Sequence, residues 1–318
     1  MSSERVFNSA IIYRHPPCFA INRSGKIEWN IRTAAVKISR PTAVFMEHDY
    51  AMSLKHFAKC VKDKIKDGHI QPIVIVALGD SVTMGCMKDC NDYENVYHAR
   101  LKKLLERQYP QAVFSVINAG IGGDSAKGGL RRLQRDVIRY LPDLVIIGFA
   151  LNDSCCGIEN LDEYRKAMST MVNRIRKRTK ADVVLLTPNF MNFADSPNVP
   201  DEYRKCKLAD VFAKIQKGGI LKRYAETIRE VADEYGANVA DTYAAWEELS
   251  AAGVDTDALL VNGLNHPVAA AHAIPAELVM RCIVDDFNVT AVRNIIKKYG
   301  KTTSHMKKQR IIKKSVAD

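Results

Sequence analysis

The sequence predicts an α/β fold, a three-layer α/β/α sandwich of the flavodoxin-like kind built around a five-stranded parallel sheet. Two observations predict it. From residue 72 onward, short apolar runs rich in β-branched residues alternate with longer stretches whose apolar residues recur at helical spacing. Glycine-containing polar turns then follow several of the apolar runs, and in such sheets ligands bind beyond the carboxyl ends of the strands.

The apolar runs define the expected strands. The first of them, Ile73 to Leu78, contains no polar residue, as is typical of a strand buried on both faces. The five expected strands span residues 73–78, 112–118, 143–149, 182–187 and 237–241.

Helical stretches separate these strands, which favours parallel pairing through right-handed crossovers. The expected helices span residues 92–108, 126–140, 161–178 and 206–235, and a last one runs from Pro267 through Ala269 to Met280. Residues 188–205, which include Asn189, Asn192, Pro197 and Pro200, are expected to form a long loop near the same sheet edge, as part of a substrate wall.

The sequence suggests three segments. Residues 1–70 are interpreted as a small lead-in module, with strand-like alternation at 27–32 and 34–38 and a helix over 53–67. Residues 71–285 form the main domain. Residues 286–318 form a basic C-terminal helix or tail, whose last 22 residues carry eight lysines and arginines against Asp318 alone.

Composition limits the functional classes. No apolar run approaches the ~20 residues of a membrane span, and the N-terminus lacks a signal-peptide pattern, so a cytoplasmic protein is expected. The eight cysteines form no Cys-x-x-Cys pair and no Cys/His cluster of zinc spacing, so neither a metal nor another cofactor is expected. The net charge of +11 resides largely in the tail, where no aromatic interleaving supports nucleic-acid binding. The sequence does not reveal the oligomeric state.

A serine follows the first expected strand, in Gly79-Asp80-Ser81. At the start of a helical turn it has unpaired backbone N–H groups beside it, which suits a nucleophile whose reaction develops negative charge. The same tripeptide is also an ordinary helix cap, and a second copy ends at Ser125, so it does not decide the function alone.

Four blocks in this order resemble the GDSL/SGNH hydrolase family of esterases and lipases, over roughly residues 72–285. The blocks are Gly79–Gly85, Asn118–Ser125, Ala150–Asp153 and Asn262–Pro267. The resemblance implies an SGNH-hydrolase fold and a carboxylic ester hydrolase with a Ser-His centre.

The resemblance also implies a role for one residue of each block. Ser81 matches the nucleophile and His266 the general base, while the Gly123 N–H and the Asn152 amide match donors of the oxyanion hole. This chemistry needs an imidazole to take the serine proton, and donors to hold the charge that develops on the carbonyl oxygen.

The chain departs from the family pattern at two positions. Ala150 replaces the glycine that normally opens the third block, which is expected to matter little. Gly263 occupies the position of the acid three residues before the histidine. A backbone carbonyl or Asn262 in a Ser-His dyad, a displaced Asp255 or Asp257, or a weak or inactive enzyme are the alternatives that remain open.

The expected function is therefore a serine esterase that acts on short acyl esters, acetyl esters in particular, of small molecules or oligosaccharides. Lipid and thioester substrates stay open, as does a non-catalytic binding module on the same fold. A dinucleotide site is not expected, because Ser125 replaces the third glycine of that fingerprint and no acidic residue ends a second strand. His272 is interpreted as a packed or capping histidine.

Overall fold

The computed structural model describes residues 20–21, 27–28, 54–67 and 71–300. The chain divides into two units, Met1–Asp49 and Tyr50–Asp318. In the first unit, strands β1 (Ala20–Ile21) and β2 (Ile27–Glu28) pair antiparallel. The remainder of the strand-like stretches and the tail after residue 300 lie outside the described residues, so the proposed three-segment division stays a prediction.

The second unit contains the expected five-stranded parallel sheet, in the order β4-β3-β5-β6-β7. Its strands are β3 (Ile73–Gly79), β4 (Phe114–Gly120), β5 (Leu144–Gly148), β6 (Asp182–Leu186) and β7 (Asn238–Ala240). The chain order reverses at β3, which lies between β4 and β5. Polar loops beyond the carboxyl ends of these three strands therefore converge on one crevice.

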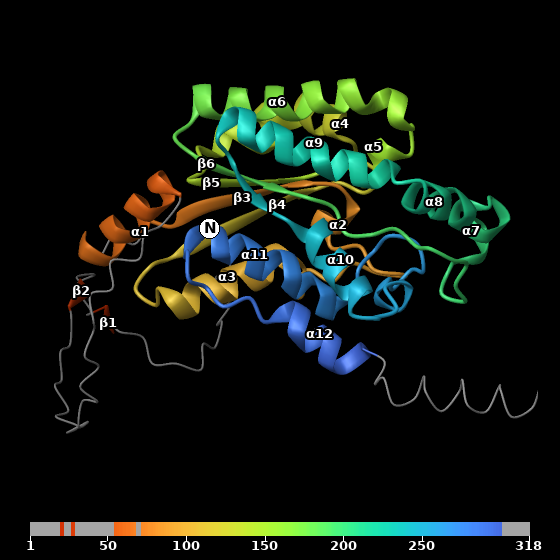
Figure 1. Ribbon diagram of the computed structural model, residues 1–318. Coiled ribbons are helices and arrows are strands. Elements are labelled where there is room, and N and C mark those ends of the chain that lie inside the picture. The colour runs from red at the N-terminus through yellow and green to blue at the C-terminus, as the bar shows by residue number, and fades with distance from the viewer. Residues whose placement is uncertain (1–19, 22–26, 29–53, 68–70, 301–318) are drawn as a thin grey trace, which may run out of the picture. The chain divides into compact units, whose positions relative to one another are not determined.

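Alternating side chains of the sheet supply two separate cores. Along β3, Ile75 and Ala77 face one core, and Val76 and Leu78 face the other. Helices cover both faces of the sheet (Figure 1). The first core is covered by α1 (Lys55–Asp67), α3 (Tyr97–Gln108) and α11 (Ala273–Ile283), and the second by α4 (Ala126–Asp136), α6 (Leu161–Arg178) and α9 (Ile220–Tyr235). The three-layer fold class is confirmed.

Several element boundaries differ from expectation. The expected helix 206–235 is two helices, α8 (Leu208–Lys217) and α9, because Gly218 and Gly219 interrupt it. The helix expected from residue 92 begins at Tyr97, since the Asp92 carboxylate accepts the N–H groups of the next turn and holds it as a loop. Helices α7 (Asp201–Lys205), in the expected loop 188–205, and α10 (Thr242–Ala251) were not expected, whereas α12 (Ala291–Tyr299) lies within the segment expected to form a helix or tail.

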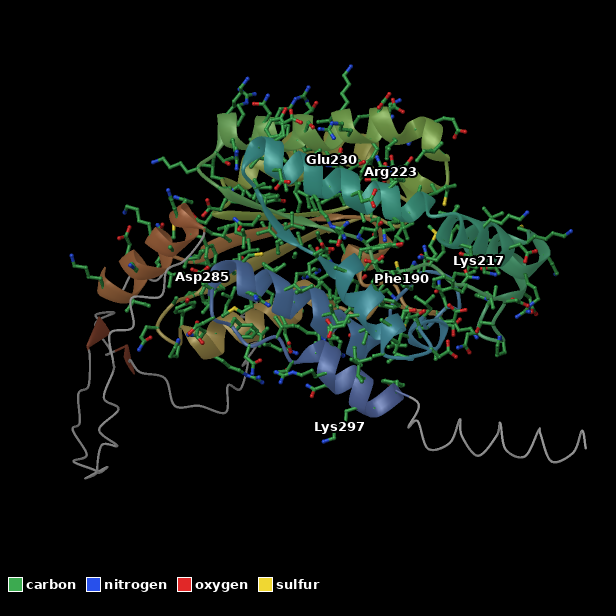
Figure 2. The ribbon with its side chains drawn as sticks, viewed as in Figure 1. Phe190, Lys217, Arg223, Glu230, Asp285 and Lys297 are labelled. Carbon is green, nitrogen blue, oxygen red and sulfur yellow. The ribbon has the colours of Figure 1, made fainter. Side chains whose placement is uncertain are left out.

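The polarity of the side chains follows this layering. Phe190, after β6, is buried and packs against Tyr243 and Trp246, whereas charged side chains such as Glu230 and Lys297 project from the outer helices (Figure 2). Within the described ranges, every helix is too short or too polar to cross a bilayer.

Candidate active site

A short helix places Ser81 at the carboxyl edge of the sheet. Helix α2 (Ser81–Met84) begins directly after β3, and Asp80 caps it by accepting the Val82 N–H at 3.0 Å. The Ser81 hydroxyl lies 2.9 Å from Nε2 of His266. Two residues that are 185 positions apart in the chain are therefore in hydrogen-bond contact, as expected for a nucleophile and its base.

A clamp formed by Asn262 holds the loop that carries His266. The Oδ1 atom of Asn262 accepts the N–H groups of Leu264, Asn265 and His266 at 3.1, 3.1 and 2.9 Å. Asn189 supports the same loop by donating to the Asn265 carbonyl at 2.9 Å. Residues of the 188–205 stretch thus brace the histidine loop.

The second ring nitrogen of His266 faces the main chain. Its Nδ1 lies 3.3 Å from the carbonyl oxygen of Met87. A carbonyl oxygen only accepts hydrogen bonds, so this contact requires the proton on Nδ1 and leaves Nε2 as an acceptor towards Ser81. The loop of Met87 is closed by a 2.8 Å bond from the Met87 N–H to the Cys90 carbonyl.

The carboxylates considered as orienting groups are engaged elsewhere. Asp257 accepts the N–H groups of Phe193 and Ala194 at 2.8 and 2.9 Å, and Asp255 accepts the N–H of Asp257. With Asn262 serving its own loop, the Met87 carbonyl is the partner of His266 Nδ1 among the described residues.

The position of the missing acid is sterically closed. Gly263 has φ of +65°, and a Cβ there would lie 2.9 Å from Cβ of Ser196 and 3.0 Å from the backbone nitrogen of Val199. The 188–205 stretch therefore occupies the space into which a side chain at residue 263 would point.

Burial sets the ionisation of the site. Desolvation lowers the pKa of His266, although the Met87 carbonyl opposes this by favouring the charged ring. The histidine is therefore predominantly neutral at neutral pH, the form in which it can take a proton. Burial raises the pKa of Asp80 to about 7 and that of Asp153 to about 6. Each of these carboxyls accepts a backbone N–H, from Val82 and Ala126 respectively.

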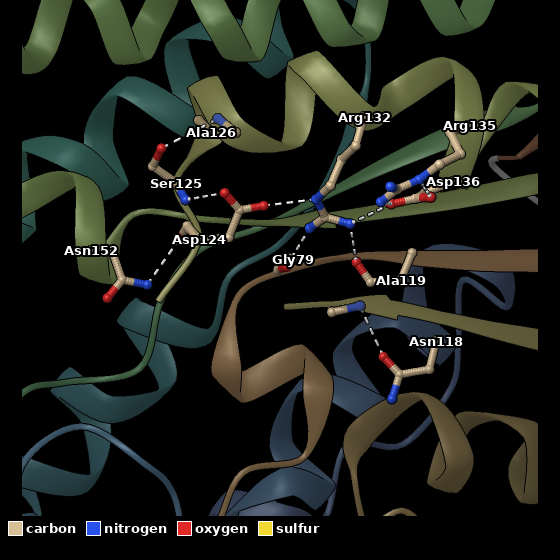
Figure 3. A network of polar contacts seen from close by, with 12 residues as sticks. Gly79, Asn118, Ala119, Asp124, Ser125, Ala126, Arg132, Arg135, Asp136 and Asn152 are labelled. Atoms are coloured by element: carbon tan, nitrogen blue, oxygen red, sulfur yellow. Dashed lines mark hydrogen bonds and ion pairs between the residues drawn. The ribbon is translucent and has the colours of Figure 1, made fainter. Parts of the chain in front are cut away.

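Arg132 joins the second block to the ends of two strands (Figure 3). Its guanidinium donates to the carbonyls of Gly79 and Ala119 and pairs with Asp124 at 2.7 Å. It is buried, with 9% of its side chain exposed. The turn that contains Gly123 and Asp124 is thereby fixed relative to the end of β3, where Ser81 begins.

The N–H groups expected to form the oxyanion hole belong to Ser81, Gly123 and Asn152. Gly123 has φ of +72°, and neither its N–H nor that of Ser81 has an acceptor among the described residues. Asn152 lies in helix α5 (Leu151–Ser154), and its side-chain amide donates one hydrogen to the Asp124 carbonyl at 2.9 Å. The second amide hydrogen is available for another acceptor. Ser125 instead caps α4 by accepting the N–H of Gly128.

Ala150, which replaces the glycine of the family pattern, has a backbone conformation that is unfavourable for alanine. Ala150 is fully buried and has φ of +146°, a region that glycine adopts freely and alanine does not. The methyl group therefore lies on a backbone that has a glycine-like conformation, which the sequence did not indicate.

His272 makes no hydrogen bond to the described residues. It is buried, and desolvation lowers its pKa to about 3, so the ring is neutral. This agrees with its interpretation as a packed histidine.

A parallel sheet that brings a serine and a histidine together at its carboxyl edge is the arrangement of an SGNH-type ester hydrolase. The model of the GDSL-like lipase/acylhydrolase family matches residues 77–274. The chain therefore belongs to the GDSL-like lipase/acylhydrolase family, and the predicted class, a carboxylic ester hydrolase, is confirmed.

Two curated proteins are similar to the chain. An acetylxylan esterase of Geobacillus stearothermophilus is 26% identical over 198 residues, which cover 58% of this chain and 79% of that protein. The uncharacterized lipoprotein YqeF of Bacillus subtilis (strain 168) is 25% identical over 202 residues, which cover 61% of this chain and 80% of that protein. Because one relative is a lipoprotein, the cytoplasmic location stays a prediction.

Solved structures show the same fold. The acetylxylan esterase of Geobacillus stearothermophilus superposes with a TM-score of 0.51 at 23% identity, covering 66% of this chain and 93% of that one. A catalytic mutant of that enzyme superposes with a TM-score of 0.52, and the superposition covers 68% of this chain and 94% of that one.

Proposed function

We propose that the chain is a serine esterase that removes short acyl groups, acetyl in particular, from the hydroxyl groups of carbohydrates. The observation that carries the proposal is the 2.9 Å contact between Oγ of Ser81 and Nε2 of His266. The contact joins a weak nucleophile to a neutral base, and the Met87 carbonyl selects the tautomer that can accept the proton.

In the first half-reaction, Ser81 Oγ attacks the acyl carbon while its proton moves to Nε2 of His266. The C–O bond to the alcohol then breaks, and His266 returns the proton to the departing oxygen. This leaves an acyl group on Ser81. In the second half-reaction a water molecule gives a proton to His266 and attacks the acyl carbon. The bond from this carbon to Ser81 Oγ then breaks, and His266 returns the proton to Oγ, which releases the acid and restores the serine.

The oxyanion of each tetrahedral intermediate would be held by the N–H groups of Ser81 and Gly123 and the free amide hydrogen of Asn152. Support comes from the unsatisfied state of these donors and from the Arg132 network that fixes the Gly123 turn. One such donor typically contributes about 3–4 kcal/mol to the lowering of the barrier.

The substrate class rests on the relatives. The matched curated enzyme is an acetylxylan esterase, and a solved neighbour is an acetyl-xylooligosaccharide esterase. Acetylated xylo-oligosaccharide is therefore the natural substrate to test first, with acetylated monosaccharides and longer acyl chains as comparisons.

The test compares hydrolysis of an aryl acetate, an aryl octanoate and acetylated xylo-oligosaccharide by the wild type, Ser81→Ala and His266→Ala. Ser125→Ala is the matched control, because it alters the second Gly-Asp-Ser copy, which caps a helix. Activity on both acetyl substrates that is lost in the first two variants and kept in the control is expected. Equal or faster hydrolysis of the octanoate would overturn the short-acyl assignment.

A phosphonate ester that labels serine nucleophiles distinguishes an esterase from the alternative, a non-catalytic binding module. A wild-type protein that hydrolyses none of the esters and forms no adduct at Ser81 would be a binding module on this fold, and the proposal would fail.

A further inference from the structure

Three side chains with metal-binding atoms meet at the amino-terminal edge of the sheet. His56 and Cys60 lie on α1, and Asp143 directly precedes β5. Nε2 of His56 lies 3.1 Å from Oδ1 of Asp143, and Sγ of Cys60 lies 3.3 Å from the same oxygen and 3.4 Å from Nε2. One atom from each residue therefore forms a small, nearly equilateral triangle.

The triangle matches one face of a zinc coordination tetrahedron. With Zn–S of about 2.3 Å and Zn–N and Zn–O of about 2.0–2.2 Å, tetrahedral ligand atoms lie about 3.4–3.6 Å from one another. The observed separations of 3.1, 3.3 and 3.4 Å need to widen by only about 0.2–0.3 Å to admit the ion.

The backbone positions these three ligands in advance. His56 and Cys60 are four residues apart, so they share one face of α1, as two zinc ligands at i and i+4 on a helix do. The second carboxylate oxygen of Asp143 accepts the N–H of Val74 at 2.8 Å, which fixes the orientation of the carboxylate. About a quarter of the His56 side chain and slightly less of the Asp143 side chain are exposed, so an ion can enter.

We propose that His56, Cys60 and Asp143 bind one Zn²⁺ ion, with water as the fourth ligand on the exposed side. A thiolate, an imidazole and a carboxylate together favour zinc over Mg²⁺ or Ca²⁺, which prefer ligand sets made only of oxygen. On binding, the Cys60 thiol loses its proton to solvent and its sulfur forms the bond to the metal.

This site is separate from the Ser81–His266 centre. Asp143 lies before the first residue of β5, whereas Asn152 lies beyond the carboxyl end of the same strand, with the whole strand between them. The ion would join α1 to β5 across the core that holds Phe57 and Leu144, so its effect is on stability and not on ester hydrolysis.

The test uses the full chain, stripped of metal with a chelator and then dialysed against Zn²⁺ or Co²⁺. We expect one Zn²⁺ bound per wild-type chain, and a thiolate-to-metal charge-transfer band with Co²⁺. Cys60→Ser and Asp143→Asn are expected to lower the affinity at least about 100-fold, since even changes behind metal ligands cost 10–100-fold. Cys206→Ser, which alters an exposed thiol elsewhere, is the matched control and retains both signals.

Thermal unfolding gives a second measurement. Zn²⁺ is expected to raise the unfolding temperature of the wild type and of Cys206→Ser, and to leave that of Asp143→Asn unchanged. Circular dichroism of each metal-free variant identifies any that fails to fold, and Asp143→Asn keeps an acceptor for the Val74 N–H. Equal Zn²⁺ binding by the wild type and both ligand variants, or no binding by a folded wild type, would overturn the proposal. Neither result would depend on whether the chain hydrolyses esters.

Discussion

Nδ1 of His266 lies 3.3 Å from the carbonyl oxygen of Met87, so a main-chain oxygen and not a carboxylate contacts this ring nitrogen. In a serine protease, exchanging the acid for an amide costs roughly 10⁴ in rate because the wrong tautomer is held. Here the carbonyl holds the productive tautomer, but it carries no full charge with which to stabilise the imidazolium. The expected consequence is a working centre that is slower than one with an acid.

Restoring an acid at the family position is not expected to improve this centre. Gly263→Asp would place a side chain at φ of +65° and against Ser196 and Val199. We expect a loss of stability of about 1–3 kcal/mol from backbone strain alone, with more from the clash, and no gain in kcat. Urea unfolding measures the change in stability, and aryl acetate hydrolysis measures kcat.

Gly253→Asp is the matched control for this variant. Gly253 has φ of +79°, but a Cβ there meets nothing within 4 Å. The difference between the two variants therefore isolates the clash. If Gly263→Asp were no less stable than Gly253→Asp, or raised kcat, the closed position inferred for residue 263 would be wrong.

The lowered pKa of His266 predicts the acid limb of the pH profile. The active form is neutral, and burial moves its pKa below 6.5, so kcat/KM should decline only as the pH falls through a value lower than 6.5. The profile of kcat/KM for aryl acetate between pH 4 and 9 provides the check. An inflection at or above 6.5 would contradict the assignment of His266 as a buried base.

The lowered pKa of His266 also makes the free energy of unfolding depend on pH. The folded state binds a proton on His266 more weakly than the unfolded state, so the free energy of unfolding falls as the pH drops below 6.5. His98 and His272 act in the same direction, since burial lowers their pKa values to about 4 and about 3.

Removal of the Asn152 amide tests the oxyanion hole. Asn152→Ala is expected to lower kcat by about 10²–10³-fold with little change in KM, because the donor acts mainly in the transition state. Asn160→Ala, which alters a neighbouring asparagine whose amide is 3.5 Å from the Asp153 carbonyl, serves as the control. A loss of equal size in both variants would point to a general disturbance of this loop.

Arg132 is expected to act as a positioning residue for the Gly123 turn. Arg132→Lys cannot reach the carbonyls of Gly79 and Ala119 and the carboxylate of Asp124 together. Breaking a buried ion pair typically costs about 3–5 kcal/mol, and we expect kcat to fall more than KM changes. Arg135→Lys is the matched control, because Arg135 pairs with Asp136 as Arg132 does but is 65% exposed. An unchanged ratio of kcat to KM in a destabilised Arg132→Lys would limit this residue to a structural role.

Ala150→Gly is expected to stabilise the protein. It relieves a backbone conformation that costs about 1–3 kcal/mol for a residue with a side chain, against about 0.5–1 kcal/mol of added chain entropy. Ala271→Gly, at a buried alanine that lies in a 3₁₀ helix, should destabilise instead. Urea unfolding of both variants gives the sign, and a destabilised Ala150→Gly would show that the methyl group contributes more by packing than it costs in strain.

The sheet could be predicted from the sequence because its inner strands β3, β5 and β6 are largely buried and therefore appear as apolar runs. The boundaries were less accurate where local hydrogen bonds decided them. Asp92 delays the start of α3, and Gly218-Gly219 divides α8 from α9. In both cases a few polar or flexible residues override the apolar periodicity.

The contact between Ser81 and His266 followed from family blocks, but the surroundings of the site did not. No side-chain pattern marks Met87, because its contribution is a main-chain oxygen, and Arg132 acts through carbonyls that any residue could supply. The strain at Ala150 depends on a dihedral angle. The sequence did not indicate the cluster of His56, Cys60 and Asp143, because Asp143 lies 83 residues beyond Cys60 and only the fold brings it to α1.

The orienting group of His266 has a genetic consequence. Every residue carries a carbonyl, so no amino-acid replacement at position 87 deletes the oxygen that faces the imidazole. Alanine scanning would pass over this position, whereas proline would remove the Met87 N–H that closes the loop. Only changes that alter the path of the loop from Cys86 to Asn91, such as an inserted or deleted residue, would separate the histidine from its partner.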